Sequence, residues 1–382
     1  MENSALNKIK EAVRSRVYNN DHFRLQWKNA NPFAGTDKEW AYNAGTGFTI
    51  GIVYDPAHYH RYYIAACIDL KISYKVVDIL KDNWIGEINN SGCAGFMVWP
   101  HINSQVLKDI LDERTYLMSR YLKKPVYPDP ESIALLDNKR RVRDWLLANN
   151  FLPPETWCFS EKTEAIQFIN NATYPIVFKT IKGSVSRGVE IIRNKKRAMQ
   201  LVNTCFGAGI HPYRMDRRNN QWDFILFQEY LENCEEKRLI RIGESYFSIE
   251  KIRGTTAYHS GSGHMKWSEK NEYYLNKTKE LTDLGNFSCM NVDFLIDKDG
   301  KDYINELHPL FHGPRILDQT NQGRYLFDEG TNGWKFEAGN YYRNYTTNCR
   351  VLDFINKLGI DYKDKKDWLS KDVFYEINGR RM

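Results

Sequence analysis

The sequence lacks paired cysteines, long apolar runs and low-complexity tracts. Its seven cysteines are scattered singly, without a CxxC pair, and an odd, unclustered set is typical of reduced thiols rather than of a disulfide framework or a zinc site. No apolar run approaches the roughly 18 residues that a membrane-spanning helix needs. The N-terminal stretch MENSALNKIKEAVRSR has no apolar segment and no small-residue cleavage site, so we expect no secretory signal. We therefore expect a cytoplasmic protein that does not enter a membrane.

Familiar nucleotide-binding motifs are missing as well. The stretch KGSVSRGV, residues 182–189, matches neither GxxxxGK[ST] nor GxGxxG, which excludes a P-loop or a Rossmann fingerprint there. Lys and Arg number 54 against 48 Asp and Glu, and these cations form short clusters instead of one basic patch. No RNP-like stacking motif occurs either, so we do not expect a nucleic-acid partner.

What remains is an ordinary globular composition, with 42% hydrophobic and 27% charged residues over 382 positions. That length allows two or three domains. Strands and helices are predicted to alternate in the first third of the chain, with strands at 48–55, 73–80 and 94–100 and helices at 58–70 and 106–121. This alternation predicts a parallel α/β domain.

Two histidines near the start of this domain, His58 and His60, form an HxH pair that can suggest a metal site. The spacing predicts that they lie on a helix, where positions i and i+2 do not face each other. We therefore do not favour a metal site at this pair.

The stretch MNVDFLIDKDGKDYINELHPLFHG, residues 290–313, alternates polar and apolar residues on both sides of Asp299-Gly300. This dipeptide is a strong signal for a two-residue hairpin turn. Such a turn predicts five facing pairs: Asn291 with His308, Val292 with Leu307, Asp293 with Glu306, Phe294 with Asn305, and Ile296 with Tyr303. Like charges opposed at about 5 Å destabilise a hairpin, and a divalent cation would offset the repulsion. A solvated hairpin with two acids on its wet face, or a longer turn with another register, is the alternative.

Two further stretches carry residue types suited to anions. A strand at 175–178 ends at Lys179, and a loop rich in glycine and serine leads to a second strand at 189–192. Backbone N–H groups of such a loop could wrap a polyphosphate, although an ordinary hairpin loop also favours Gly and Ser. Lys139 begins a predicted helix at 139–149, where an anion suits the helix N-terminus better than a lysine does. A solvated lysine in a basic run is the alternative.

The stretch FILFQEYLENCEEKRLIRIGESYFSIEKIRG, residues 224–254, predicts a strand that ends near Gln228, an acidic turn, and a hairpin around Gly243-Glu244. Arg238, Lys251 and Arg253 lie on or at the ends of the hairpin strands. Any one of them could be a charge on an exposed strand face.

The order of five segments resembles the ATP-grasp superfamily over residues 47–313, nearest to its glutathione-synthetase and ribosomal-protein glutamate-ligase branches. LLDNK resembles the DK segment of the family, and PIVFKTIKGSVSRGVEII resembles its strand lysine and phosphate-covering loop. FQEYLENCEEKR resembles the hinge that receives adenine, and RLIRIG with FSIEKIRG resembles the strands that carry a phosphate-binding arginine. VDFLIDKDGKDYINELHP resembles the final metal-binding hairpin.

This resemblance implies an α/β and α+β protein with the ATP-grasp fold, an N-terminal α/β domain and a small lid subdomain. The implied boundaries are an arm at 1–46, an N-terminal domain at 47–127, the lid subdomain at 128–205, the large subdomain with the metal site at 206–318, and a helical tail at 319–382. The C-terminal tail is expected to hold a helix around Cys349 to Leu358.

The resemblance also implies roles for individual residues. The implied ATP-binding residues are Lys139, Lys179, Gly183, Ser184, Ser186, Gly188, Gln228, Tyr230, Leu231 and Glu235. The implied catalytic cations are Arg253, Arg238 and Lys182, and the implied metal ligands are Asp293, Glu306 and His308. The family usually has Asn where this chain has His308. Because imidazole suits Mn²⁺ better than Mg²⁺, Asn291 is our expected source of a further oxygen.

The implied function is ATP-dependent joining of a small-molecule or peptide carboxylate to an amine through an acyl phosphate, with ATP and Mg²⁺ or Mn²⁺ as cofactors. A homodimer is compatible with this. The alternatives are an ATP-grasp kinase that phosphorylates a small molecule and a nucleotide-binding module without turnover.

Overall fold

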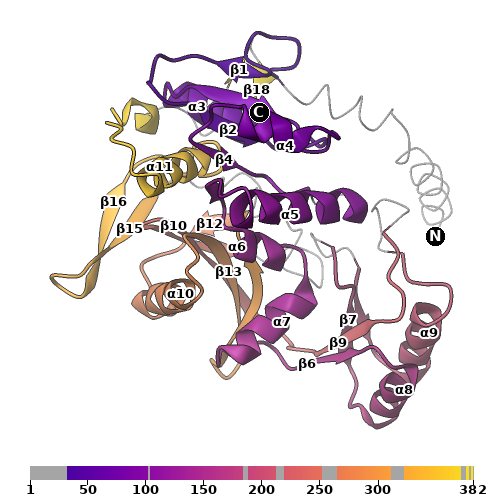
Figure 1. The fold of residues 1–382 in the computed structure, drawn as a ribbon. Helices are drawn as coiled ribbons and strands as arrows, with labels where there is room; N and C mark the ends of the chain where they lie inside the picture. Colours follow the sequence, from indigo (N-terminus) through magenta and orange to yellow (C-terminus); the bar gives the residue numbers. More distant parts are fainter. Residues whose placement is uncertain are drawn as a thin grey trace.

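The computed structural model of this chain describes residues 32–101, 104–183, 188–211, 219–251, 265–310, 322–370, 376–377 and 380–381. Three sheets and the helices that cover them make up most of this part (Figure 1). Every helix in the described ranges is too short or too polar to cross a lipid bilayer.

The first sheet has five strands in the order β1-β3-β2-β4-β5. Its elements in chain order are β1 (Ala41–Tyr42), β2 (Ile50–Val53), α3 (Arg61–Asp69), β3 (Tyr74–Val77), α4 (Trp84–Asn89), β4 (Gly95–Met97), α5 (Gln105–Arg120) and β5 (Val126–Tyr127). Strands β2 to β5 run parallel, and β1 pairs antiparallel with β3. The predicted parallel α/β domain is therefore confirmed, apart from its edge strand.

The helix that was predicted from residue 58 begins three residues later. His58 has a left-handed backbone with φ of 62°, and His60 is the N-cap residue of α3. Both lie on the loop after β2, so the i and i+2 argument for a helix does not apply to them. Both are buried, and His60 Nδ1 accepts a hydrogen bond from the backbone N–H of Asp55 at 3.2 Å. Packed histidines are thus what the structure has here.

The second sheet has four antiparallel strands in the order β6-β9-β7-β8. The elements that reach it are α6 (Pro130–Leu135), α7 (Lys139–Ala148), β6 (Thr156–Phe159), α8 (Lys162–Asn171), β7 (Ile176–Lys179), β8 (Val189–Ile192), α9 (Lys195–Cys205) and β9 (Ile225–Glu229). Helices α8 and α9 lie side by side on one face of the sheet (Figure 1). Strand β9 pairs between β6 and β7 and therefore belongs to this sheet. It lies beyond residue 205, where we expected the lid subdomain to end.

The third sheet has seven strands, six of them in the order β14-β13-β10-β11-β15-β16, with β12 paired to β11. Its elements are β10 (Glu235–Ile242), β11 (Ser245–Lys251), β12 (Met265–Trp267), α10 (Glu272–Leu284), β13 (Cys289–Ile296), β14 (Asp302–His308), β15 (Gly323–Asp328) and β16 (Gly333–Ala338). Strands β15 and β16 fall in the range where we expected a helical tail. They instead extend the large sheet, and the expected helix follows them as α11 (Thr347–Lys357).

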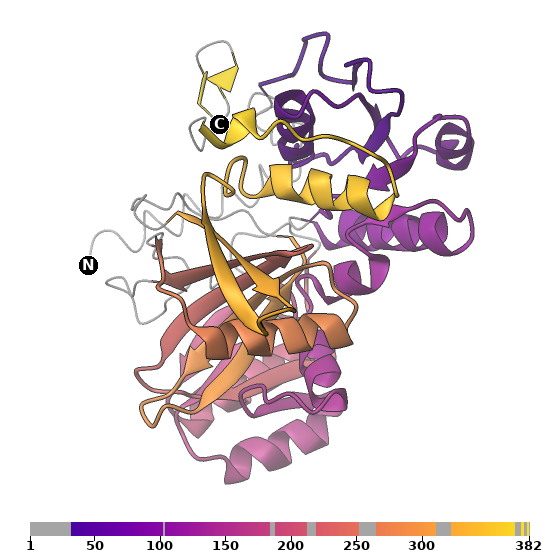
Figure 2. The ribbon, with the colours of Figure 1, turned by 90° about the vertical axis from the view of Figure 1, so that its left-hand side faces the viewer.

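Helix α11 lies between the first and third sheets (Figure 2). One apolar cluster includes residues of β2, α3, β10, β11 and α11, so the N-terminal domain packs directly on the large sheet. Buried Asp69 of α3 also accepts hydrogen bonds from Arg343 and Asn344, which precede α11. These contacts join α3 of the N-terminal domain to the segment that leads into α11.

The loop between β7 and β8 closes at Gly188, whose φ is 74°. Its carbonyl accepts the backbone N–H of Thr180 at 2.8 Å. A Cβ at Gly188 would lie 2.0 Å from Thr180 Oγ1, and that hydroxyl is committed to the carbonyl of Lys182 at 2.6 Å. The sequence therefore needs glycine at this end of the loop.

We predict that Gly188→Ala destabilises the protein more than Gly300→Ala does. Gly300 has a similar φ of 82° but open space around its Cβ position, so it reports only the backbone cost of about 1 kcal/mol. The overlap with Thr180 should add roughly 1–3 kcal/mol. Urea unfolding of both variants measures the difference, and equal losses would contradict the crowding at Gly188.

Candidate functional site

The two predicted acids face each other on β13 and β14. The observed register pairs Asn291 with His308, Val292 with Leu307 and Asp293 with Glu306. These pairings confirm the sequence-based prediction at the site itself.

The predicted pairings nearer the turn are wrong. Phe294 pairs with Ile304 and not with Asn305, and Ile296 pairs with Asp302 and not with Tyr303. The turn is not the two-residue Asp299-Gly300 type, because the loop from 297 to 301 is closed by the backbone N–H of Asp297, which donates to the carbonyl of Lys301 at 2.9 Å. The register therefore changes by one residue between the turn and the acids.

A β-bulge at Asn305 makes this change. The register shifts between Asp293 and Phe294, which leaves Asn305 as the extra residue on β14. Without it, Asp293 would face Asn305 instead of Glu306. Bulges turn side chains away from the ladder direction, and here Asn305 Oδ1 accepts a hydrogen bond from Lys179 Nζ at 3.1 Å. The bulge thus brings the acids together and joins β14 to the lysine at the end of β7.

Asp293 is completely buried and has donors on both carboxylate oxygens. Arg238 Nε and Nη2 each donate at 2.8 Å, one to each oxygen. Lys251 Nζ donates to Oδ2 at 2.6 Å, and Asn291 Nδ2 donates to Oδ1 at 3.1 Å. Burial alone would raise the pKa of Asp293, but Arg238 and Lys251 outweigh it and hold the pKa well below its usual value.

Glu306 has a different environment from Asp293. Its Oε2 lies 3.0 Å from His308 Nε2, and its side chain is partly exposed. Burial opposes ionisation, but His308 and then Lys139 lower the pKa of Glu306 below its usual range. With Nε2 directed at Glu306, His308 contacts a neighbouring carboxylate and is poorly placed to offer that same nitrogen to a cation.

The oxygen atoms of these residues suit a hard cation, provided that Lys251 moves away from Asp293. Asn291 Oδ1 is buried and has no hydrogen-bond partner among the residues that the structure describes. This carbonyl and the Glu306 carboxylate are oxygen ligands of the kind that Mg²⁺ prefers. Asp293 could join them only if Lys251 moved away. In the described ranges, no three His, Cys, Asp or Glu side chains are grouped to hold a metal, so the metal site stays a prediction.

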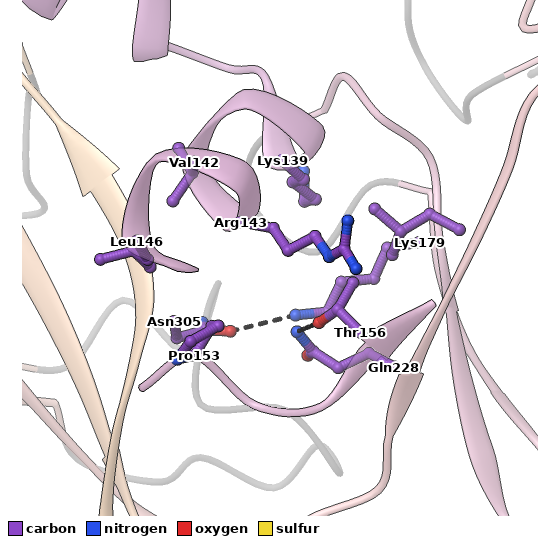
Figure 3. A pocket seen from close by; sticks show the side chains of 10 residues that line it. Lys139, Val142, Arg143, Leu146, Pro153, Thr156, Lys179, Gln228 and Asn305 are labelled. Carbon is purple, nitrogen blue, oxygen red and sulfur yellow. Dashed lines mark hydrogen bonds between the residues drawn. The ribbon is translucent and has the colours of Figure 1, made fainter. Parts of the chain in front are cut away.

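A pocket lies between α7 and the four-stranded sheet, beside the bulge (Figure 3). It is lined by Lys139, Val142, Arg143 and Leu146 of α7, by Pro153 and Thr156, by Lys179 of β7, by Leu226 and Gln228 of β9, and by Asn305 of β14. Apolar side chains and polar or cationic ones therefore share the lining. Three of the predicted ATP-binding residues, Lys139, Lys179 and Gln228, meet here.

The two predicted lysines of the pocket have unequal surroundings. Lys139 Nζ donates to the carbonyl of Gly183 at 2.8 Å, so the start of α7 holds the start of the glycine-rich loop. Lys179 is half-buried, and burial lowers its pKa to about 8. Glu306 acts in the opposite direction, while Lys139 lowers this pKa further. Lys179 is therefore a cation at neutral pH, but it loses its proton at a lower pH than an ordinary lysine does.

Arg143 is a pocket residue that the sequence-based prediction missed. It follows Lys139 by four residues, and i and i+4 share one face of a helix, so this signal was present in the sequence. Arg143 Nη1 donates to Asp144 at 2.7 Å. Its Nε is buried and has no acceptor within the described ranges. Lys251 was also omitted from the predicted site, although it lies on the same hairpin as Arg238.

Among the described residues, the other predicted ATP-binding and catalytic residues are not part of the pocket lining. Gly183 donates its backbone N–H to Asp137 Oδ1 at 2.8 Å, and Lys182 Nζ lies 3.4 Å from Asp109 of α5. Tyr230 and Leu231 are half-buried after β9, and Glu235 is exposed at the start of β10. The predictions for Arg253, Ser184 and Ser186 fall outside the described residues.

The chain is similar to solved structures of two synthetases and of one further ATP-grasp protein. D-alanyl-alanine synthetase A from Vibrio cholerae O1 biovar eltor matches with a TM-score of 0.53 and 15% identity, over 82% of this chain and 99% of that chain. N5-carboxyaminoimidazole synthetase from Staphylococcus aureus, complexed with ADP, matches with a TM-score of 0.51 and 14% identity, over 85% and 80%. A RimK-domain ATP-grasp protein from Sphaerobacter thermophilus matches at 0.45 and 13%, over 68% and 90%.

At such identities, the two likenesses with TM-scores above 0.5 show the fold alone. No family model and no curated protein matches the sequence. The chain has the ATP-grasp fold, which confirms the fold predicted from the order of the five segments.

We predict that Lys251→Met lowers thermal stability by roughly 5–10 °C, since removing one partner of a buried ion pair leaves a buried charge unmatched. Lys251 contacts both Glu236 and Asp293 with little solvent exposure. Lys81→Met is the matched control, because Lys81 pairs with Glu87 at 3.3 Å on the surface and such pairs contribute little. Circular dichroism melts of both variants test this, and similar shifts would contradict the buried network.

Proposed function

We propose that this protein is an ATP-dependent carboxylate–amine ligase of the cytoplasm. The observation that supports it most directly is the hydrogen bond between Lys179 Nζ and Asn305 Oδ1. This bond joins β7, which bears Lys179, to Asn305, the neighbour of Glu306. Glu306 in turn faces Asp293 in the ladder. Cations for a polyphosphate and acids for a metal ion are thereby neighbours in one site.

ATP would occupy the pocket of Figure 3. Val142 and Leu226 offer apolar contact to a base, and Gln228 offers a polar one. Lys139 and Lys179 would neutralise phosphate charge, with Arg143 as a third cation from the same wall. The segment with Gly183, Ser184, Ser186 and Gly188 would cover the phosphates, and Tyr230, Leu231 and Glu235 would hold the rest of the nucleoside from the chain that follows β9.

The chemistry needs no side-chain nucleophile. A carboxylate oxygen of the substrate attacks the γ-phosphorus of ATP, the bond to the bridging oxygen breaks, and ADP leaves. The amine then attacks the acyl phosphate, and inorganic phosphate departs as the amide forms. Catalysis of this kind comes from positioning and from charge stabilisation.

The cations Arg238, Arg253 and Lys182 would stabilise the charge on the transferred phosphoryl group. Arg238 donates Nε and Nη2 to Asp293, so it would act on the phosphoryl group from beside the proposed metal ligand. Glu306 and Asp293, with Asn291 or His308, would hold Mg²⁺ or Mn²⁺. When bound, the metal would neutralise phosphate charge. The substrates would be a small-molecule or peptide carboxylate and an amine, and the chain could act as a homodimer.

An acyl phosphate can be trapped with hydroxylamine. We expect the protein with ATP, Mg²⁺ and a panel of carboxylic acids and peptides to release ADP and to form a hydroxamate with its true substrate. A carboxylate that drives ADP release without a hydroxamate would contradict the ligase. A stable phosphorylated product made without an amine would indicate the ATP-grasp kinase. Tight ATP binding without formation of ADP would indicate a nucleotide-binding module without turnover.

We predict that ATP binding weakens as pH rises through about 8, because free Lys179 loses its proton there whereas the ammonium is favoured beside phosphate. The complex then takes up a proton on binding, so affinity should fall by roughly tenfold between about pH 7.5 and 9.5. Titration calorimetry at several pH values measures this. Lys179→Arg should remove the dependence and keep binding, and Lys179→Met should weaken binding at every pH. An unchanged slope in both variants would contradict the assignment.

A further inference from the structure

We infer that Thr156 fixes the side-chain amide of Gln228 so that its carbonyl oxygen is the atom offered to a base, and that the pocket therefore selects 6-aminopurine over 6-oxopurine nucleotides. This rests on the proposed binding of a nucleoside triphosphate. It adds a positioning residue, Thr156, that acts through Gln228, the residue that the proposed function already places against the base.

The backbone places these two side chains together. Thr156 is the first residue of β6 and pairs directly with Gln228 of β9 in the antiparallel ladder. Both side chains line the pocket, and both residues are less than a tenth exposed. Facing side chains on neighbouring strands are within reach of each other, and Figure 3 shows the hydrogen bond that joins them.

The hydroxyl of Thr156 has one proton, which it donates in a hydrogen bond to a backbone carbonyl. Thr156 Oγ1 donates to the carbonyl of Pro154 at 2.7 Å, and a carbonyl can only accept. Toward Gln228 the hydroxyl can therefore only accept, and Gln228 Nε2 donates to it at 3.0 Å. Rotating the amide by half a turn would set two acceptors against each other, so the hydrogen-bond chain fixes its orientation.

With Nε2 turned to Thr156, Oε1 is the polar atom that Gln228 can offer to a ligand. An acceptor suits the exocyclic amino group of adenine and repels the carbonyl oxygen of hypoxanthine or guanine. Lys179 cannot make this distinction, because a cationic donor suits the N7 acceptor that all these purines share. Discrimination at position 6 therefore depends on how the amide of Gln228 is turned.

The test compares the binding of ATP and ITP, which differ in the amino or oxo group at position 6 and in the proton that the oxo form carries on N1. We expect wild-type protein to bind ATP roughly 100-fold more tightly than ITP in calorimetric titrations, since sites built to hydrogen-bond a base reject an analogue that cannot pair. Thr156→Val keeps the shape and removes the acceptor. It should weaken ATP binding and strengthen ITP binding, narrowing the ratio below about tenfold.

Thr156→Ser keeps the hydroxyl and should retain the wild-type ratio. Opposite changes for the two nucleotides separate positioning from structural damage, which would weaken both together. Equal binding of ATP and ITP by the wild type would overturn the inference and leave the proposed function standing. An unchanged ratio in Thr156→Val would overturn the role of Thr156. Binding of neither triphosphate would overturn both the inference and the function.

Discussion

The buried carboxylate of Asp293 is the interaction on which the rest of the site depends. A carboxylate without solvent is costly unless it is paired and fully hydrogen-bonded, and this one receives donors from Arg238, Lys251 and Asn291. These three residues come from β10, β11 and β13, which are neighbours in the sheet. The pairing therefore fixes the centre of the large sheet and places two cations on Asp293, the residue that faces Glu306.

The second constraint is the extra residue on β14. A regular ladder continued from the observed turn would place Asn305, and not Glu306, opposite Asp293. The bulge corrects this, and the displaced Asn305 reaches Lys179 on another sheet. One irregularity thus does two things that a regular hairpin could not do together. It aligns the acids, and it joins the large sheet to the sheet that bears the pocket.

The sequence predicted those features that depend on local pattern. Strand β8 has the predicted bounds, 189–192, and α11 differs from its predicted range by one or two residues. The facing of Asp293 and Glu306 was predicted from the alternation of apolar residues around Asp299-Gly300. The five segments in order predicted the ATP-grasp fold although each is short.

Other features depend on contacts that a pattern cannot carry. Strand β6 and helix α8 were missed because the stretch 154–171 mixes polar and aromatic residues without a clear period. The bulge was missed because two arrangements give the same register at the acids. One is the predicted two-residue turn, and the other is the observed longer loop followed by an extra residue on β14. Lys251 looked like one more strand-face charge, and only the tertiary pairing shows that it is buried against Asp293.

The burial of Lys251 has a consequence for how charge would enter this site. While the ammonium contacts Asp293 and Glu236, a divalent cation at Asp293 would meet a positive charge that is already paired. A triphosphate placed among Lys139, Arg143 and Lys179 would bring several negative charges and give Lys251 another partner. Electrostatics therefore favours a cation that arrives with the nucleotide over one that binds first. In the proposed site, the cations that stabilise the free protein would therefore oppose the binding of a metal ion until the phosphates are in place.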